Sequence, residues 1–136
     1  MKIPDFIIHD LEQGLFLAQI SKRFNQRITF YSAPGAVGSI GPLIFKSIIT
    51  EVNLQFPNAK LLAILDCGCE PGFAMSAIRL GVSNIHINLC GKMRIKIEEI
   101  ALANRTNIFN APINAVDLDK FANIDRLNKR YNEPKK

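Results

Sequence analysis

Short runs of hydrophobic residues alternate along this chain with longer segments in which hydrophobic positions recur every three or four residues. The short runs predict β-strands, and the longer segments predict amphipathic α-helices. The predicted strands are residues 5–8, 27–32, 60–65, 84–89 and 107–109. The predicted helices are residues 11–23, 42–55, 71–80 and 92–103, and a short helical turn is expected near 117–122.

Residues with known end preferences support these boundaries. Asp10 is expected to cap the first helix, with Gln13 three residues later as its capping-box partner. Pro42 and Pro71 stand at predicted first helical positions, where the missing N–H of proline costs nothing. The hydrophobic run 61–65 is typical of a strand that is buried on both faces, as in the centre of a parallel sheet.

Strands that alternate with helices predict an α/β fold, because parallel neighbours need a helical crossover between them. Five such units are too few for a closed eight-stranded barrel. We therefore expect an open, three-layer, mostly parallel five-stranded sheet with helices on both faces, Rossmann-like or flavodoxin-like. The expected organisation is one domain over residues 1–125, followed by a basic and flexible tail over 126–136.

The formal net charge is +5, and most of it lies in the tail, where five basic residues accompany one acidic residue. The body therefore lacks the basic face typical of nucleic-acid-binding proteins, although the tail could contact an acidic partner. No hydrophobic run is long enough to cross a bilayer, and the first ten residues do not have the pattern of a signal peptide. Three cysteines, an odd number, argue against a disulfide framework. These features favour a cytoplasmic protein that does not contact membranes.

In open parallel sheets, ligands bind beyond the carboxyl ends of the strands. We call this border of the sheet the carboxyl edge. The polar and glycine residues of the chain gather where predicted strands end, including a loop rich in glycine and proline at 33–42 whose amides could bind an anion. The predicted ligand-binding residues are Ser32, Gly35, Gly38, Asp66, Gly68 and Gly72.

The segment Ile64–Phe73 reads Ile-Leu-Asp-Cys-Gly-Cys-Glu-Pro-Gly-Phe. It resembles the first motif of S-adenosylmethionine-dependent methyltransferases, an Asp-x-Gly-x-Gly-type junction between a strand and a helix. The resemblance implies that Gly68 and Gly72 lie beside the cofactor. Glu70 stands where the family usually has a glycine, so a site of this kind would be degenerate.

Three side chains are candidates for catalysis because each lies at a predicted strand end: Asp66, the neighbouring thiol of Cys67, and His9. The three cysteines, Cys67, Cys69 and Cys90, also follow strands and are weak candidates for a metal site. Their spacing does not contain the Cys-x-x-Cys pattern of zinc sites.

These patterns favour a small non-enzymatic α/β module that binds a small polar or anionic ligand, or a protein partner, at the carboxyl edge. One alternative is an enzyme with a degenerate methyltransferase-like site or a thiol or metal site. Another is a structural protein that acts as a homo-oligomer, because edge strands can pair between copies. The sequence leaves the cofactor, the ligand and the strand order open.

Overall fold

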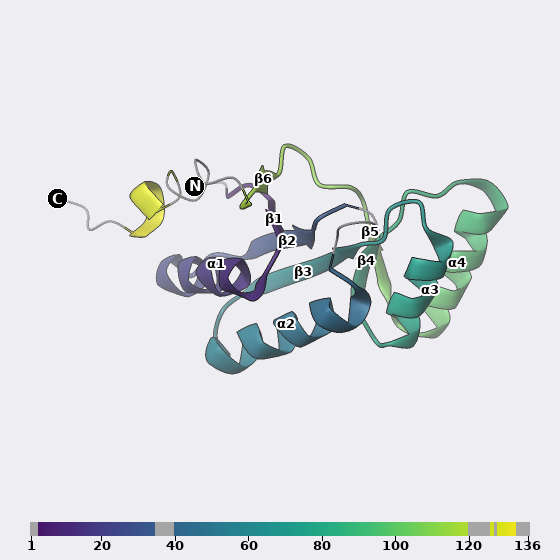
Figure 1. Cartoon of the computed structure of the whole chain (residues 1–136), viewed down its shortest axis with the longest axis horizontal. Helices are drawn as coiled ribbons and strands as arrows, with labels where there is room; N and C mark the ends of the chain where they lie inside the picture. Colours follow the sequence, from purple (N-terminus) through teal and green to yellow (C-terminus); the bar gives the residue numbers. More distant parts are fainter. Residues whose placement is uncertain (1–2, 35–39, 120–125, 127, 133–136) are drawn as a thin grey trace.

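The computed structural model describes residues 3–34, 40–119, 126 and 128–132. Within these ranges the strands form one parallel sheet of six strands, in the order β5-β4-β3-β2-β1-β6 (Figure 1). The strands are β1 (Phe6–Ile8), β2 (Ile28–Ser32), β3 (Leu61–Asp66), β4 (Asn84–His86), β5 (Asn107–Phe109) and β6 (Val116–Asp117).

Helices connect the first five strands, as the hydrophobic pattern predicts. They are α1 (Leu11–Phe24), α2 (Pro42–Gln55), α3 (Pro71–Arg79) and α4 (Gly91–Ala103), and a short π-helical turn, η1, covers Asn128–Asn132. The cap of α1 is confirmed, because the backbone N–H of Gln13 donates to Asp10 Oδ1 over 2.9 Å. The prediction of a helical turn near 117–122 is wrong at its start, because Asp117 is the last residue of β6. Residues 120–122 lie outside the described ranges.

The open parallel α/β sheet is confirmed, with β6 as an additional short strand. The expected placement of helices on both faces is wrong. Each of the first four crossovers steps to the next strand in the same direction, so right-handed connections put all four helices on one face. Contacts of α2 with α1 and with α3, and of α3 with α4, show the resulting single layer. The hydrophobic core lies between this layer and the sheet.

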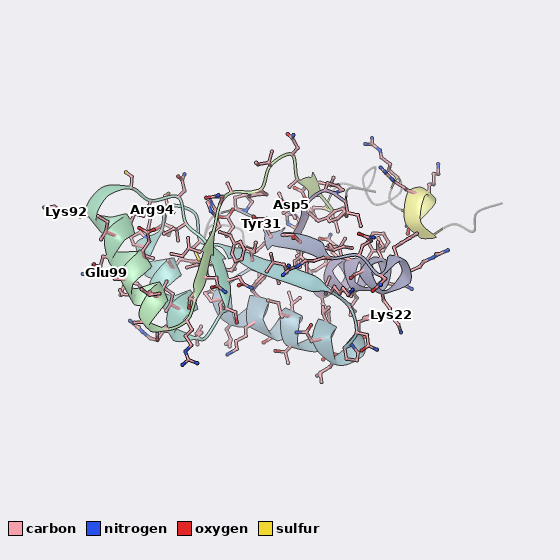
Figure 2. All side chains as sticks on the ribbon, turned by 180° about the vertical axis from the view of Figure 1, so that it is seen from behind. Asp5, Lys22, Tyr31, Lys92, Arg94 and Glu99 are labelled. Atoms are coloured by element: carbon pink, nitrogen blue, oxygen red, sulfur yellow. The ribbon has the colours of Figure 1, made fainter. Side chains whose placement is uncertain are left out.

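The second face of the sheet is crossed by the connection from β5 to β6, which runs above the sheet in Figure 1 while α2 lies below it. Tyr31 points to this face, and its hydroxyl donates to Asn110 O over 2.9 Å. Burial, and then the nearby carboxylates of Asp5 and Asp66, raise the pKa of Tyr31. Figure 2 shows Tyr31 close to Asp5 on this side. The connection therefore takes the place of a second helical layer over the centre of the sheet.

Across the described ranges, none of the helices combines the length and the hydrophobicity that crossing a membrane requires.

Candidate functional site

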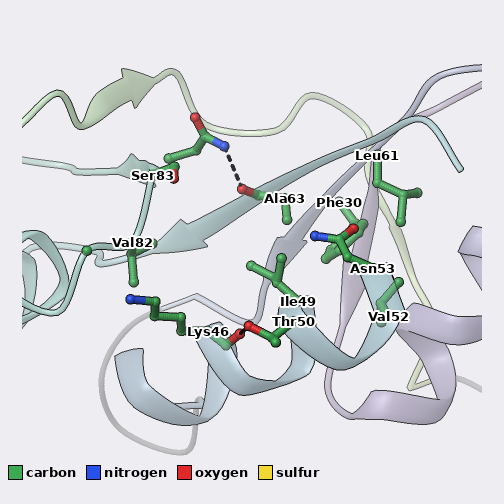
Figure 3. A pocket seen from close by; sticks show the side chains of 12 residues that line it. Phe30, Lys46, Ile49, Thr50, Val52, Asn53, Leu61, Ala63, Val82 and Ser83 are labelled. Carbon is green, nitrogen blue, oxygen red and sulfur yellow. Dashed lines mark hydrogen bonds between the residues drawn. The ribbon is translucent and has the colours of Figure 1, made fainter. Parts of the chain in front are cut away.

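A cavity of about 310 Å³ opens between α2 and the amino-terminal ends of β3 and β4 (Figure 3). It lies on the helical side of the sheet, where α2 and the turn after α3 leave a space between themselves and the strands. Hydrophobic side chains form much of its wall: Phe30, Ile49, Val52, Leu61, Ala63 and Val82. Apolar walls of this kind are typical of small-molecule sites.

Polar groups line the remainder of the cavity. Lys46 Nζ donates to the carbonyl oxygen of Leu80 over 2.7 Å, which holds the ammonium group at the border of the cavity. The Asn53 amide and the Ser83 hydroxyl also line it, and neither side chain has a hydrogen-bond partner among the residues that the structure describes. One fixed cation and two unpaired polar groups therefore face the same space.

Gly81 determines how closely Lys46 can approach the turn after α3. Its φ angle is +81°, a conformation that favours glycine, and a Cβ built there would lie 3.1 Å from Lys46 Nζ. A side chain at position 81 would thus strain the turn and crowd the ammonium group of Lys46.

The described lining of the cavity carries groups that can bind a molecule. Among its described lining residues, Lys46 is the only one with an ionisable side chain. A lysine ammonium beside polar and hydrophobic groups suits the retention of an anionic or hydrogen-bond-accepting molecule.

At the carboxyl edge, the structure brings Ser32, Asp66 and Gly68 together. The backbone N–H of Asp66 donates to Ser32 Oγ over 2.9 Å, and the N–H of Gly68 donates to Asp66 Oδ1 over 2.9 Å. Gly68 has a φ angle of +55°, which explains a glycine in this turn. These bonds give Ser32 and Asp66, both buried, a structural role in closing the ends of β2 and β3.

The other predicted binding residues are glycines. Gly72 lies in the first turn of α3, and a Cβ at this position would meet nothing within 4 Å. Gly72 is exposed, and its place beside a cofactor stays a prediction. Gly35 and Gly38 lie outside the described residues.

His9 pairs with a residue distant in the sequence. Its Nε2 lies 2.7 Å from Asp117 Oδ1, and both side chains are partly exposed. Asp10, the neighbouring carboxylate, caps α1 instead. The pair joins the end of β1 to β6, so it fixes the last strand to the sheet, and the role of His9 in catalysis stays a prediction.

The three cysteines do not share one environment. Cys67 is fully buried, and burial followed by the charge of Asp66 raises the pKa of its thiol to about 12, whereas Cys69 and Cys90 are exposed. A protonated thiol is a poor nucleophile and a poor metal ligand. No three His, Cys, Asp or Glu side chains in the described part of the chain are placed to hold one metal ion.

No protein-family model matches the chain, and no match is found among the curated proteins. A functional conclusion therefore depends on the geometry of the cavity and of the carboxyl edge.

Sequence reasoning missed the cavity and its polar residues. Lys46 stands too far beyond the glycine-rich loop 33–42 to be a phosphate-loop lysine, so no sequence motif marks it. The available signal was a single cation on a helix whose other residues around it are hydrophobic or uncharged. Asn53, two turns further along α2, had no signal of its own until α2 was placed against the sheet.

Proposed function

We propose that this protein is a non-enzymatic α/β module that binds a small molecule with an anionic or polar group in the cavity between α2 and the starts of β3 and β4. The observation that carries the proposal is the Lys46 ammonium, which is hydrogen-bonded to the Leu80 carbonyl beside a hydrophobic wall. A charge-assisted hydrogen bond from such a group contributes about 1.5–3 kcal/mol to binding.

The dimensions favour a compact ligand. A volume of about 310 Å³ lies at the lower end of the range of roughly 300–1,000 Å³ for small-molecule sites. Asn53 and Ser83 would supply further hydrogen bonds to a polar group, and the wall around Phe30 would cover a hydrophobic body. A small organic acid combines these features.

The proposal keeps the ligand class expected from the sequence and moves the site away from the carboxyl edge. At that edge Ser32 and Asp66 are already bonded to the backbone, and the buried carboxylate of Asp66 disfavours an anion. Within the described ranges, the high thiol pKa of Cys67 also favours binding over a thiol enzyme. A methyltransferase-like site beside Gly68 and Gly72 remains the alternative.

The test is a binding titration with a defined panel of benzoate, isobutyrate and inorganic phosphate, together with the uncharged analogues benzamide and isobutyramide. Binding is followed by amide chemical shifts of the full chain in NMR spectra. We expect an acid of the panel to shift resonances from α2 and residues 81–84, and to bind more tightly than its amide. S-adenosylmethionine is included to test the alternative site.

The variant Lys46→Met keeps the length of the side chain and removes its charge. Loss of a charge-assisted bond should weaken binding of the acid about 10- to 100-fold, with no change for Lys96→Met on α4. Equal binding by the Lys46→Met variant, shifts confined to the carboxyl edge, or no binding by any panel member would contradict the proposal.

A further inference from the structure

The outward face of α2 carries three large exposed hydrophobic side chains among polar ones. Leu43, Ile44 and Leu54 are 60%, 58% and 72% exposed. Phe45, which packs into the core, points the opposite way. In Figure 1, α2 lies at the border of the molecule, below the sheet and away from the β5–β6 connection. Three large hydrophobic side chains on one exposed helix indicate a surface that contacts another molecule.

Along this face two leucines stand at the ends of a line of positions, which we call the seam, with two small hydroxyl residues between them. Leu43, Ser47, Thr50 and Leu54 follow one another at intervals of four, three and four positions, which is the a/d spacing of a heptad repeat. The two central hydroxyls are already satisfied, since Ser47 Oγ donates to Leu43 O and Thr50 Oγ1 donates to Lys46 O, each over 2.9 Å. Covering them therefore leaves no donor unpaired, and their small size permits close approach.

Two opposite charges flank this seam. Lys46 and Glu51 lie on either side of it, at the g and e positions of the heptad, five residues apart. Neither side chain forms an ion pair within the described part of the chain, although Glu51 Oε1 accepts a hydrogen bond from Gln55 Nε2 over 2.9 Å. Lys46 Nζ has three N–H donors and gives one to Leu80 O, so the others remain available.

We propose that the occupant of this face is a second copy of the chain, with the two α2 helices parallel about a two-fold axis. In a parallel pair, a g residue meets the e residue five positions later on the other helix. Lys46 of each copy would then contact the partner's Glu51. In an antiparallel pair the two Glu51 side chains would share one flank and repel, so the charges select the parallel arrangement.

The contact is short. The 14 residues of α2 span about 21 Å. An interface built on one such helix belongs to the class below about 1,200 Å², in which complexes are weak. We therefore expect a dimer that forms at roughly 10–100 μM protein and dissociates on dilution. This inference does not rest on the proposed ligand site.

Sedimentation velocity of the full chain between about 5 and 500 μM, at low salt, tests the proposal. We expect the average mass to rise from one to two copies over this range. Glu51→Lys and Lys46→Glu should each weaken the dimer at least about tenfold, because each places like charges in contact. The double variant carrying both changes should restore wild-type affinity to within about threefold. Lys96→Glu, on α4, is the matched control and should have no effect.

Leu54→Asp places two carboxylates in the seam and should leave only the monomer. A monomer at every wild-type concentration overturns the proposal. So does a dimer that is indifferent to Glu51→Lys or to Leu54→Asp. A double variant that stays as weak as the single ones overturns the parallel arrangement. Circular dichroism of each variant verifies that the fold is intact.

Discussion

Replacing Ser32 by alanine removes the hydroxyl that accepts a hydrogen bond from the backbone N–H of Asp66 over 2.9 Å. Strand β2 ends at Ser32, so this side chain continues the pairing with β3 beyond the last backbone partners. Ser32 is fully buried and Asp66 is 5% exposed, so water cannot readily replace the lost acceptor. We expect the Ser32→Ala variant to fold with reduced stability.

The size of the effect follows from the unpaired amide. Leaving a buried donor without a partner costs about 1–3 kcal/mol. With an unfolding entropy of about 2.1 cal/mol/K per residue, a chain of 136 residues loses about 3.5 °C of Tm per kcal/mol. The Tm of the variant should therefore fall by about 3–10 °C.

The assay is urea denaturation followed by circular dichroism, with a thermal scan of the same samples, at a protein concentration below about 5 μM so that association plays no part. The control is Ser76→Ala on the exposed side of α3, which should change the free energy of unfolding by less than about 0.5 kcal/mol. A loss of less than 0.5 kcal/mol for Ser32→Ala, with an unchanged m value, would refute the role assigned to this hydrogen bond.

Two further predictions concern glycine and thiol chemistry. Gly81→Ala should lower the free energy of unfolding by about 1–2 kcal/mol, because φ at this residue is +81°. Gly72→Ala has open space around its new Cβ and should raise the free energy of unfolding by up to about 1 kcal/mol. Thermal denaturation compares the two variants, and an equal loss of stability in both would contradict this expectation. The pKa of Cys67 is raised from 9.0 to about 12 in the fold, so unfolding releases a proton above pH 9 and stability should fall as the pH rises from 9 towards 12. The stability of the Cys67→Ala variant, measured by urea titration at each pH, should fall less steeply over this pH range. A thiol reagent at pH 8 should modify the two exposed cysteines of the native chain but not Cys67.

The secondary structure could be predicted because its signals are local. The Asp10 cap and the prolines at positions 42 and 71 fix helix starts, and the observed α2 has the predicted bounds. Strand β6 has only two residues, Val116 and Asp117, too few for any periodic pattern. The placement of all helices on one face depends on the order of the strands, and that order is decided by long-range packing.

The candidate site was harder to predict for a related reason. Sequence reasoning correctly placed Ser32 and Asp66 at one edge, because polar residues follow parallel strands. The cavity instead arises where side chains stop short of one another, between α2 and the turn around Gly81. A space left between elements has no residue pattern of its own, so Lys46 gained its significance only from its neighbours in three dimensions.

The pairing of β6 with β1 places the last described strand beside the first, at one edge of the sheet. Val116 N donates to Asp5 O over 2.9 Å and Leu118 N donates to Ile7 O over 3.0 Å. While the ribosome is still making the chain, β1 to β5 can assemble, yet the outer border of β1 has no neighbour until residues 116–118 emerge. A nascent or prematurely terminated chain ending at β5 would present these carbonyls to other strands, which makes it a substrate for chaperones or for aggregation.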